Sequence, residues 1–341
     1  MDILNPLSYP GWNDFLLNTP GASFFHSSAW ARVLAESYGY RPLYFTKINK
    51  GRLKDLLPLM EVDSFLTGRR GVSLPFTDYC EILHDGTLQN QNVMHTLIDC
   101  GGRRGWKSVE LRGGNGLSHD TPSSVYYGHS LSLSPDEEAV FSTFRDSTRR
   151  NIKKAVMEGV TATIDTSLDG IREFYQLNCL TRREHGLPPQ PYRFFQKIHE
   201  HVLSRDLGMV VLASHEGKTV AGAMYFHFGD MAIYKYGASD RKYQHLRANN
   251  LVMWEAIRWY CQNGYKNLCF GRTEPENKGL LQFKRGWGTR ERTIRYYRYD
   301  LVQKTFVQDK SRLKGFQKKV FQVFPVPLLR LIGEIVFKHM G

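Results

Sequence analysis

The chain repeats one pattern of apolar and polar residues after about 160 positions, and this repeat limits the folds that it can adopt. Residues 105–113, GWKSVELRG, match residues 264–272, GYKNLCFGR, at an offset of 159. Upstream, residues 45–60 match residues 211–226 at an offset of about 166, and both read as two strands joined by a polar turn. Because order and offset agree, the sequence predicts two copies of one domain.

The second copy predicts an α+β domain. Ser134, followed by a proline and by Glu137, is typical of a helix start, and this helix is expected to run to Gly159. Apolar periodicity then predicts an antiparallel meander, one crossover helix and further strands. The expected helices lie near residues 168–185, 191–204 and 245–263, and the expected strands near residues 207–214, 219–228, 231–237, 267–271 and 293–300.

The composition is that of a globular protein with excess positive charge near its C-terminus. The 341 residues are 41% hydrophobic and include 46 Lys and Arg against 33 Asp and Glu, so the net charge is +13. Residues 301–341 hold eight basic and two acidic residues. We therefore expect one domain over residues 1–133, a second over residues 134–303, and a basic tail over residues 304–341.

The five cysteines are scattered and form no Cys-x-x-Cys pair, so neither a zinc ribbon nor a disulfide framework is expected. His199 and His201 stand two apart on a predicted helix and face different sides, so no metal site is expected. The N-terminus lacks the apolar core of a signal peptide, and no run of 18 apolar residues occurs. We therefore expect a cytoplasmic protein.

The tail combines its charge with an amphipathic pattern. Leu313, Phe316, Val320 and Phe324 recur at helical spacing with lysines off that stripe, and the short apolar run LLRLIGEIVF follows. A basic amphipathic helix is typical of proteins that bind anionic membrane surfaces, so residues 305–341 predict peripheral binding to the inner face of the cytoplasmic membrane. The alternative is that both helices pack on the body of the protein.

Several short motifs carry a resemblance to a known family. They are FFHSSAW (24–30), LPL (57–59), SLPFTDY (73–79), RRNIKKA (149–155), FYQL (174–177), TRREHGLP (181–188), YGAS (236–239) and FKRGWG (283–288). In this order, and with the β-β-β-α-β pattern, they resemble the FemAB-like and BioF2-like acetyltransferase-domain family over about residues 20–300. The resemblance implies two tandem GNAT-like domains and transfer of an acyl or aminoacyl group to an amine.

Two sets of basic residues are candidate functional groups. On a helix, Arg145, Arg149 and Lys153 form one i,i+4 stripe. Arg150 and Lys154 form its neighbour. Like charges at this spacing repel unless an anion binds them, and phosphate suits arginine. The resemblance implies that this region lies near the phosphates of a donor or of a lipid-linked acceptor. It also implies that Lys284 stabilises charge during transfer, as a cation beside an oxyanion does. The alternatives are a solvated helix face and an exposed lysine.

Other candidates lie at predicted strand ends and in the family motifs. Asp78, with Tyr79 beside it, is a candidate to remove a proton from the amine or to orient it. Glu184 and His185 offer a second acid–base pair, although a histidine before a glycine is also common at helix ends. The remaining candidates, for substrate binding, are Arg272 and Thr273 after a strand, and Tyr236 and Trp287 in the motifs.

The loop before the predicted crossover helix bears on the donor. Acetyl-CoA-dependent GNAT domains have a glycine-containing loop there, whose amides bind pyrophosphate. This chain reads Leu246 to Leu251 without glycine, and the first copy reads Gln89 to Asn92. The loop therefore favours aminoacyl-tRNA or an acyl carrier protein over acyl-CoA, and no tightly bound cofactor is expected. The positive charge suits any polyanionic partner, including tRNA.

The sequence predicts an acyltransferase that acts on an amine of a cell-envelope or exopolysaccharide precursor at the cytoplasmic membrane surface. One alternative is a soluble acyl-CoA-dependent N-acetyltransferase of a small amine, which predicts CoA binding. Another is a non-catalytic membrane-associated or RNA-binding assembly factor, for which Lys284→Ala and Asp78→Ala would change stability alone.

Overall fold

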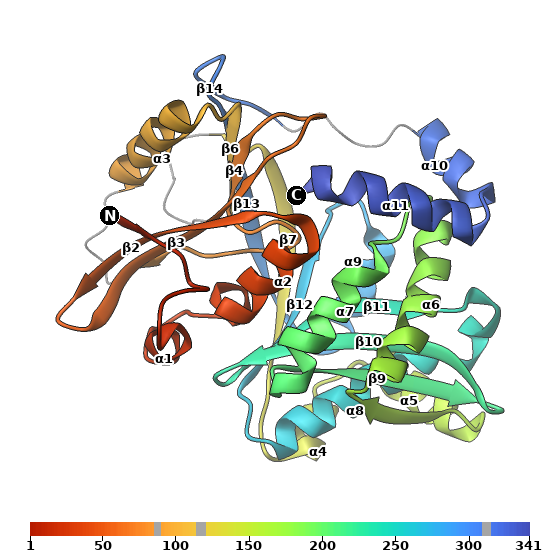
Figure 1. Cartoon of the computed structure of the whole chain (residues 1–341). Coiled ribbons are helices and arrows are strands. Elements are labelled where there is room, and N and C mark those ends of the chain that lie inside the picture. Colours follow the sequence, from red (N-terminus) through yellow and green to blue (C-terminus); the bar gives the residue numbers. More distant parts are fainter. Residues whose placement is uncertain (85–89, 114–120, 309–314) are drawn as a thin grey trace. The chain divides into compact units, whose positions relative to one another are not determined.

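A computed structural model describes residues 1–84, 90–113, 121–308 and 315–341, and the chain divides into two compact units (Figure 1). Unit 1 contains Met1–Tyr127, Thr293–Ser311 and Val336–Gly341. Unit 2 contains Gly128–Arg292 and Arg312–Ile335. The chain passes between the units inside β7 (Ser124–Ser132), β13 (Arg290–Asp300) and α11 (Val326–Met340). Residues 293–303, which the sequence analysis assigned to the second domain, thus group with unit 1.

Unit 1 is built on a mostly antiparallel sheet in the order β1-β2-β3-β4-β6-β13. β4 and β6 run parallel, as the crossover through α3 (Asn90–Arg104) requires. The other strands are β1 (Asp2–Leu4), β2 (Arg41–Asn49), β3 (Arg52–Val62), β4 (Arg70–Val72), β5 (Leu83–His84), β6 (Ser108–Arg112) and β14 (Thr305–Phe306). The other helices are α1 (Trp12–Leu17), η1 (Phe24–His26) and α2 (Ser28–Tyr38).

Unit 2 has a sheet in the order β7-β12-β11-β10-β9-β8. β11 and β12 run parallel, and α8 (Ala248–Gln262) crosses over between them. The strands are β8 (Thr161–Asp165), β9 (Gly208–His215), β10 (Lys218–Phe228), β11 (Met231–Ser239) and β12 (Asn267–Thr273). The helices are α4 (Glu137–Ser142), α5 (Asp146–Met157), α6 (Leu168–Glu184), α7 (Tyr192–His201), η2 (Leu203–Arg205), η3 (Arg241–Leu246) and α9 (Lys278–Arg285).

The two units repeat one topology, which confirms the predicted duplication of an α+β domain. The hairpin β2–β3 corresponds to the hairpin β9–β10, and both are antiparallel. In each unit a third strand follows, then a crossover helix, then a strand parallel to the third. Each sheet then gains a strand beyond β6 or β12, which is β13 in unit 1 and β7 in unit 2.

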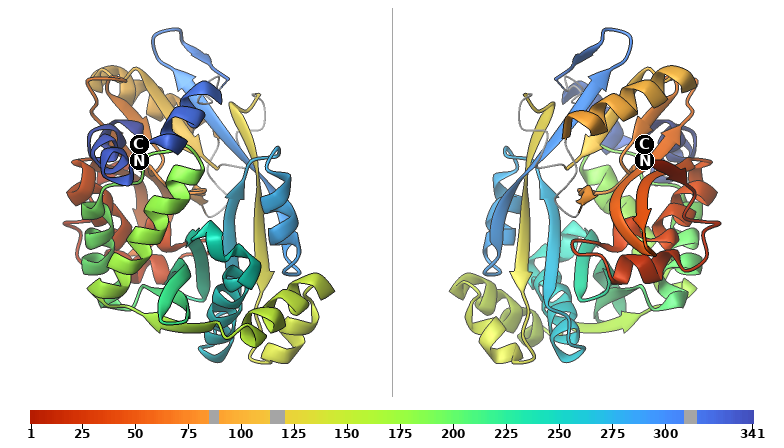
Figure 2. Two further views of the ribbon diagram at one scale, coloured as in Figure 1. Left: turned by 90° about the vertical axis from the view of Figure 1, so that its right-hand side faces the viewer. Right: turned by 90° about the vertical axis from the view of Figure 1, so that its left-hand side faces the viewer.

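Helices cover both faces of the sheet in unit 2 (Figure 2). Side chains alternate along β9, so Val211 and Ala213 join Leu251 of α8 in one buried cluster. Leu212 points the other way, and its Cδ2 and Phe174 Cδ2 of α6 both lie against Gly222. α8 therefore covers one face and α6 the other, which fixes the sheet between them.

The predicted helix from Ser134 to Gly159 is wrong, because it is two helices, α4 and α5. Asp136, and not Ser134, caps α4, and its Oδ1 accepts from Ala139 N–H at 3.0 Å. At the break, Arg145 N–H donates to Gly286 O at 3.0 Å instead of to its own helix. This tertiary hydrogen bond is invisible to periodicity, and the same is true of β8 and α9, which were not predicted.

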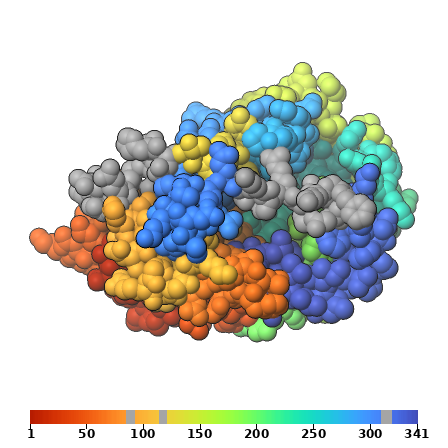
Figure 3. Space-filling model, turned by 90° about the horizontal axis from the view of Figure 1, so that it is seen from above, coloured from red at the N-terminus to blue at the C-terminus, as the bar shows by residue number. Residues whose placement is uncertain are grey.

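The tail forms α10 (Gly315–Val323) and α11, and it is partly packed and partly open. Leu329 and Phe337 of α11 are buried, whereas Leu331 and Ile335 are each 54% exposed. Figure 3 shows this segment in dark blue at the molecular surface. Leu313 of the predicted stripe, and the side chain of Phe316, lie outside the described residues. Among the described residues, no helix has the length and apolar character needed to cross a membrane.

Candidate functional site

Strands β11 and β12 pair only through their first residues. Paired positions run from Met231 with Asn267 to Ile233 with Cys269, although both strands continue beyond these pairs. Their later residues therefore separate. Gly271, with a φ of +67°, turns β12 at this point, and glycine adopts that conformation without strain. The separated ends leave backbone carbonyls that need other partners.

Lys284 supplies such a partner at the end of β12. Its side chain comes from α9 and is 2% exposed, and its Nζ donates to Gly271 O at 3.2 Å and to Arg272 O at 3.1 Å. A buried ammonium is costly unless it is hydrogen-bonded, so this placement is specific. Thr273, the last residue of β12, is fully buried beside these carbonyls. The structure thus brings together the predicted residues Lys284, Arg272 and Thr273.

A polar pocket of about 360 Å³ lies in unit 2 at the start of α8. Its walls come from α5, from β10 and β11, from η3 and α8, and from the face of α9 that carries Gly279, Gln282 and Phe283, with Gly286 directly after that helix. Polar or charged wall residues from the other elements are Arg145, Ser147, Thr148, Asn151, Ser239, the acidic Asp240, Tyr243, Gln244, Arg247, Asn249 and Asn250. One face of α9 therefore lines the pocket, and Lys284 of the same helix contacts the end of β12.

The start of α8 has the properties of an anion site. Four backbone N–H groups at a helix start lack intrahelical partners, and the helix dipole favours negative charge there. Arg247 precedes the helix with a φ of +61°, the left-handed conformation that glycine would usually supply. The absence of glycine between Leu246 and Leu251 therefore does not prevent the loop from taking this shape.

Trp287 is fully buried and supports α9. It packs against Phe144, Phe270 and Phe283, with ring centroids 5.0 to 6.5 Å apart. Its Nε1 has no hydrogen-bond partner within the described ranges of the chain. The indole therefore lies in the core cluster of unit 2, at the base of the helix that carries Lys284.

The predicted basic cluster lies on α5, mostly away from the pocket. Arg149 donates to the carboxylate of Asp146, and Lys154 lies 3.9 Å from Glu158. Arg150 and Lys153 are exposed. Acidic neighbours thus offset part of the repulsion that the sequence analysis ascribed to an absent anion. Arg145 of the predicted cluster, the N-cap residue of α5, does line the pocket, together with Ser147, Thr148 and Asn151.

Tyr236, Glu184 and His185 lie elsewhere in unit 2. Tyr236 Oη accepts from Gln190 Nε2 at 3.3 Å, and the nearby Arg182 has its pKa lowered to about 10 by burial. Glu184 and His185 are exposed at the end of α6, where His185 is the C-cap residue. These residues are not brought to the hydrogen bonds of Lys284.

Asp78 and Tyr79 belong to unit 1 and follow a strained loop. Leu74 and Phe76 have φ values of +53° and +59°, which bulky residues rarely adopt. The carbonyl of Asp78 accepts from Tyr296 Oη at 2.6 Å, and Tyr79 is 8% exposed. Strain of this kind is typical of functional sites, so the loop remains a candidate within unit 1.

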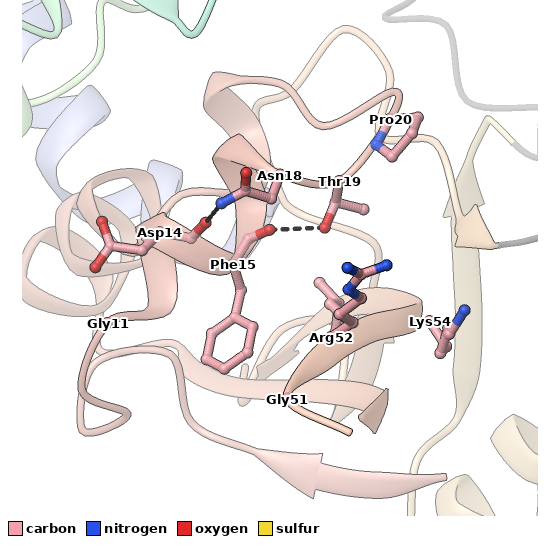
Figure 4. A pocket seen from close by; sticks show the side chains of 10 residues that line it. Gly11, Asp14, Phe15, Asn18, Thr19, Pro20, Gly51, Arg52 and Lys54 are labelled. Carbon is pink, nitrogen blue, oxygen red and sulfur yellow. Dashed lines mark hydrogen bonds between the residues drawn. The ribbon is translucent and has the colours of Figure 1, made fainter. Parts of the chain in front are cut away.

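Unit 1 also has a pocket of about 790 Å³, between α1 and the β2–β3 turn (Figure 4). Asp14, Arg52 and Lys54 point around its rim, and Asn18 Nδ2 donates to Asp14 O at 2.9 Å. Most of the lining residues are exposed. The pocket contains none of the predicted site residues.

Sequence reasoning missed the asparagine pair at the start of α8 and the contacts of His129 with Glu291. His129 Nε2 lies 3.0 Å from Glu291 Oε2, although the two residues are far apart in sequence. The polar pair Asn249 and Asn250, which begins two residues after Arg247, was a usable signal for a helix start that binds a ligand. No sequence signal identified His129.

Comparisons with known proteins bear on the fold and on the segment around this site. A family model described as an acetyltransferase (GNAT) domain matches residues 142–285. The lipid II:glycine glycyltransferase of Staphylococcus haemolyticus is 32% identical over 100 residues, which are 27% of this chain and 24% of that protein. The chain therefore matches about a quarter of the length of this relative.

Two solved structures share the fold over most of both chains. The crystal structure of FemX has a TM-score of 0.66 at 12% identity, over 85% of this chain and 95% of that chain. A tandem GNAT protein from the clavulanic acid biosynthesis pathway has a TM-score of 0.54 at 9% identity, over 88% and 98%. These likenesses confirm the predicted fold class. Residues 142–285 are therefore similar to a GNAT acetyltransferase domain, and the chain shares the fold of FemX and of a tandem GNAT protein.

Proposed function

We propose that the chain is an acyl- or aminoacyltransferase that moves its group from a phosphate-bearing donor to an amine. The observation that carries the proposal is the position of Lys284. This residue belongs to α9, which also lines the polar pocket, and its side chain is buried against the end of β12. Attack of an amine on an ester or thioester forms a tetrahedral oxyanion. A fixed cation aimed at that charge typically contributes about 10²–10³-fold in rate.

The pocket supports a donor with phosphate groups. The start of α8 offers backbone N–H groups, and Arg145 and Arg247 add positive charge at the wall. Aminoacyl-tRNA is the donor that we favour, with a lipid-linked cell-envelope or exopolysaccharide precursor as acceptor. The similarity to a lipid II:glycine glycyltransferase makes glycyl-tRNA and lipid II the first pair to test.

We further propose that the enzyme works at the inner face of the cytoplasmic membrane. Leu328, Leu331 and Ile335 are exposed at helical spacing on α11, and Lys319 and Lys338 are exposed on the same two tail helices. Deleting the tail would also remove the buried Leu329 and Phe337, so point variants test this better. Leu331→Glu with Ile335→Glu should abolish sedimentation with anionic vesicles, whereas the exposed Met157→Glu on α5 should not. Undiminished binding of the double variant contradicts a role of α11.

The first experiment measures transfer of labelled glycine from glycyl-tRNA to lipid II in vesicles. The proposal predicts labelled product with the wild-type chain and about 10²–10³-fold less with Lys284→Met. Lys278→Met, an exposed change on the same helix, is the matched control. Equal rates for wild type and Lys284→Met would contradict the assignment of Lys284.

A specific observation keeps acyl-CoA as the second candidate donor. Arg247 already takes the left-handed conformation that a pyrophosphate loop needs. A thermal-shift titration decides between the donors, because a ligand at 100 times its Kd stabilises by about 2.7 kcal/mol. A saturable rise in Tm with CoA favours an acyl-CoA-dependent N-acetyltransferase. An unchanged Tm up to millimolar CoA favours aminoacyl-tRNA or an acyl carrier protein.

A further inference from the structure

The buried His129 and the partly exposed Glu291 form a pair in unit 2 that the proposed mechanism does not use. The His129 side chain is fully buried on β7, and its Nε2 lies 3.0 Å from Glu291 Oε2 at the start of β13. The same carboxylate oxygen accepts from Arg285 Nε at 2.8 Å. Arg285 follows Lys284 on α9, so these groups share a neighbourhood.

The order of the sheet places His129 near the carbonyls that bind Lys284. β7 and β12 are neighbours, and Leu133 N–H donates to Lys266 O at 2.8 Å. Leu133 directly follows β7 and Lys266 directly precedes β12, so the two strands can lie alongside one another only if they are antiparallel. Counting back from this bond brings His129 beside the region of Gly271.

The hydrogen bonds define which ring nitrogen of His129 carries the proton. A carboxylate only accepts, so Nε2 donates to Glu291. Burial, then the positive charge of Lys284, lower the pKa of His129, whereas Glu291 raises it and Arg285 lowers it. The imidazole is therefore neutral near pH 7, and Nδ1 presents a lone pair.

Among the residues that the structure describes, that lone pair has no hydrogen-bond partner, although Nδ1 is buried. The hydroxyl of Thr273, at the end of β12, is also buried and finds no partner in the described parts of the chain. Buried polar groups are normally paired, and those left unpaired cost free energy that a ligand can recover. A base held by a carboxylate, with its other nitrogen unpaired, has the arrangement of an oriented general base.

We propose that His129, oriented by Glu291, accepts the proton of the attacking amine in the reaction at Lys284. This inference rests on the proposed function. The amine nitrogen forms a bond to the carbonyl carbon, and its proton moves to Nδ1 of His129. When the tetrahedral intermediate collapses, the bond from carbon to the leaving oxygen or sulfur breaks. The electron pair stays on the leaving atom, and His129 returns the proton to it, so no other reactant is required.

The first test needs no substrate. NMR of the full chain with ¹⁵N-labelled histidine should show His129 with its proton on Nε2 at pH 7 and a pKa below 6.5. Lys284→Met should raise the pKa of His129, because it removes a nearby positive charge. A proton on Nδ1, or a pKa that Lys284→Met leaves unchanged, would overturn the proposal.

The second test measures transfer from the donor that the assays above identify. His129→Gln keeps an amide that can donate to Glu291 but removes the base, so the rate should fall about 10²–10⁴-fold. His227→Gln, which alters another buried histidine of unit 2, is the control and should keep the wild-type rate. Glu291→Gln, at a partly exposed position, should move the acidic limb of the pH–rate profile to lower pH, because it removes a charge that raises the pKa of His129.

The outcomes separate the two proposals. Suppose that the wild type is active. If His129→Gln is then fully active, or if Glu291→Gln leaves the pH–rate profile unchanged, the role of His129 is contradicted while the proposed function stands. A wild type that is inactive with glycyl-tRNA, acyl carrier protein and acetyl-CoA donors removes the proposed function and this role with it.

Discussion

The ends of the parallel strand pairs are open in unit 2 and closed in unit 1. In unit 2, β11 continues to Ser239 beyond its last pair with β12, and Lys284 binds the carbonyls at the end of β12. In unit 1, β4 ends at Val72, and all of it pairs with β6. Arg112, at the end of β6, donates to Glu110 Oε1 at 2.6 Å.

The loop after β4 occupies the corresponding place in unit 1. Ser73 N–H donates to Glu110 O at 2.8 Å, and Ser73 Oγ accepts from Arg112 N–H at 2.7 Å. The backbone groups at the end of β6 are thus satisfied by the chain itself. Duplicated topology therefore gives two units whose strand ends present different groups.

The largest expected effect concerns Lys284, the cation that unit 2 places at the separated end of β12. Lys284→Met should lower transfer about 10²–10³-fold, because the oxyanion loses its cation. Folding should be retained, because methionine fills the volume without a buried charge. Steady-state transfer and a melting curve check this. A variant that has lost its fold would instead assign Lys284 a structural role.

Packing at the base of α9 gives the next largest effect. Gly288 has a φ of +68°, and an added Cβ would lie 2.7 Å from Thr143 Oγ1 and 2.9 Å from Thr143 O. Gly288→Ala should cost about 2–4 kcal/mol. Gly105→Ala in unit 1, where φ is +67° and no atom lies within 4 Å, should cost only the backbone strain of about 1–2 kcal/mol. Denaturant titration compares them, and equal losses would contradict the packing argument.

The pocket at the start of α8 predicts a moderate effect on donor binding. Arg145→Gln and Arg247→Gln should each raise the KM for the donor about tenfold, because a charge-assisted hydrogen bond to phosphate is worth about 1.5–3 kcal/mol. Arg52→Gln, in the pocket of unit 1, is the control. If Arg52→Gln raises KM as much as the other two, the donor does not bind as proposed.

The smallest expected effect is on the pH dependence of stability, and it compares one buried histidine of each unit. Burial lowers the pKa of His26 and of His227 from 6.5. The unfolded chain therefore binds more protons as the pH falls through this value, and the free energy of unfolding should decrease below about pH 6.5. His26→Gln and His227→Gln should each make this decrease smaller in denaturant titrations at pH 7.5 and 5.5. If the free energy of unfolding decreases between pH 7.5 and 5.5 by as much in the variants as in the wild type, the lowered pKa values are contradicted.

The sequence by itself determined the topology and part of the site. The repeat at 105–113 and 264–272 predicted two copies, and apolar periodicity predicted most elements of unit 2 within a few residues. These features are local, because a strand or helix expresses its pattern in consecutive residues. The motif around Lys284 likewise selected the residue that the structure buries at the end of β12.

Tertiary structure decided which groups meet. The break before Arg145 depends on the carbonyl of Gly286, and the pair of His129 and Glu291 joins residues that lie far apart in sequence. The strand exchange that gives β13 to unit 1 is equally nonlocal. Hydrogen bonds and burial between distant segments arise only when the sheet forms. A single sequence contains the residues for such contacts but no periodic signal that pairs them.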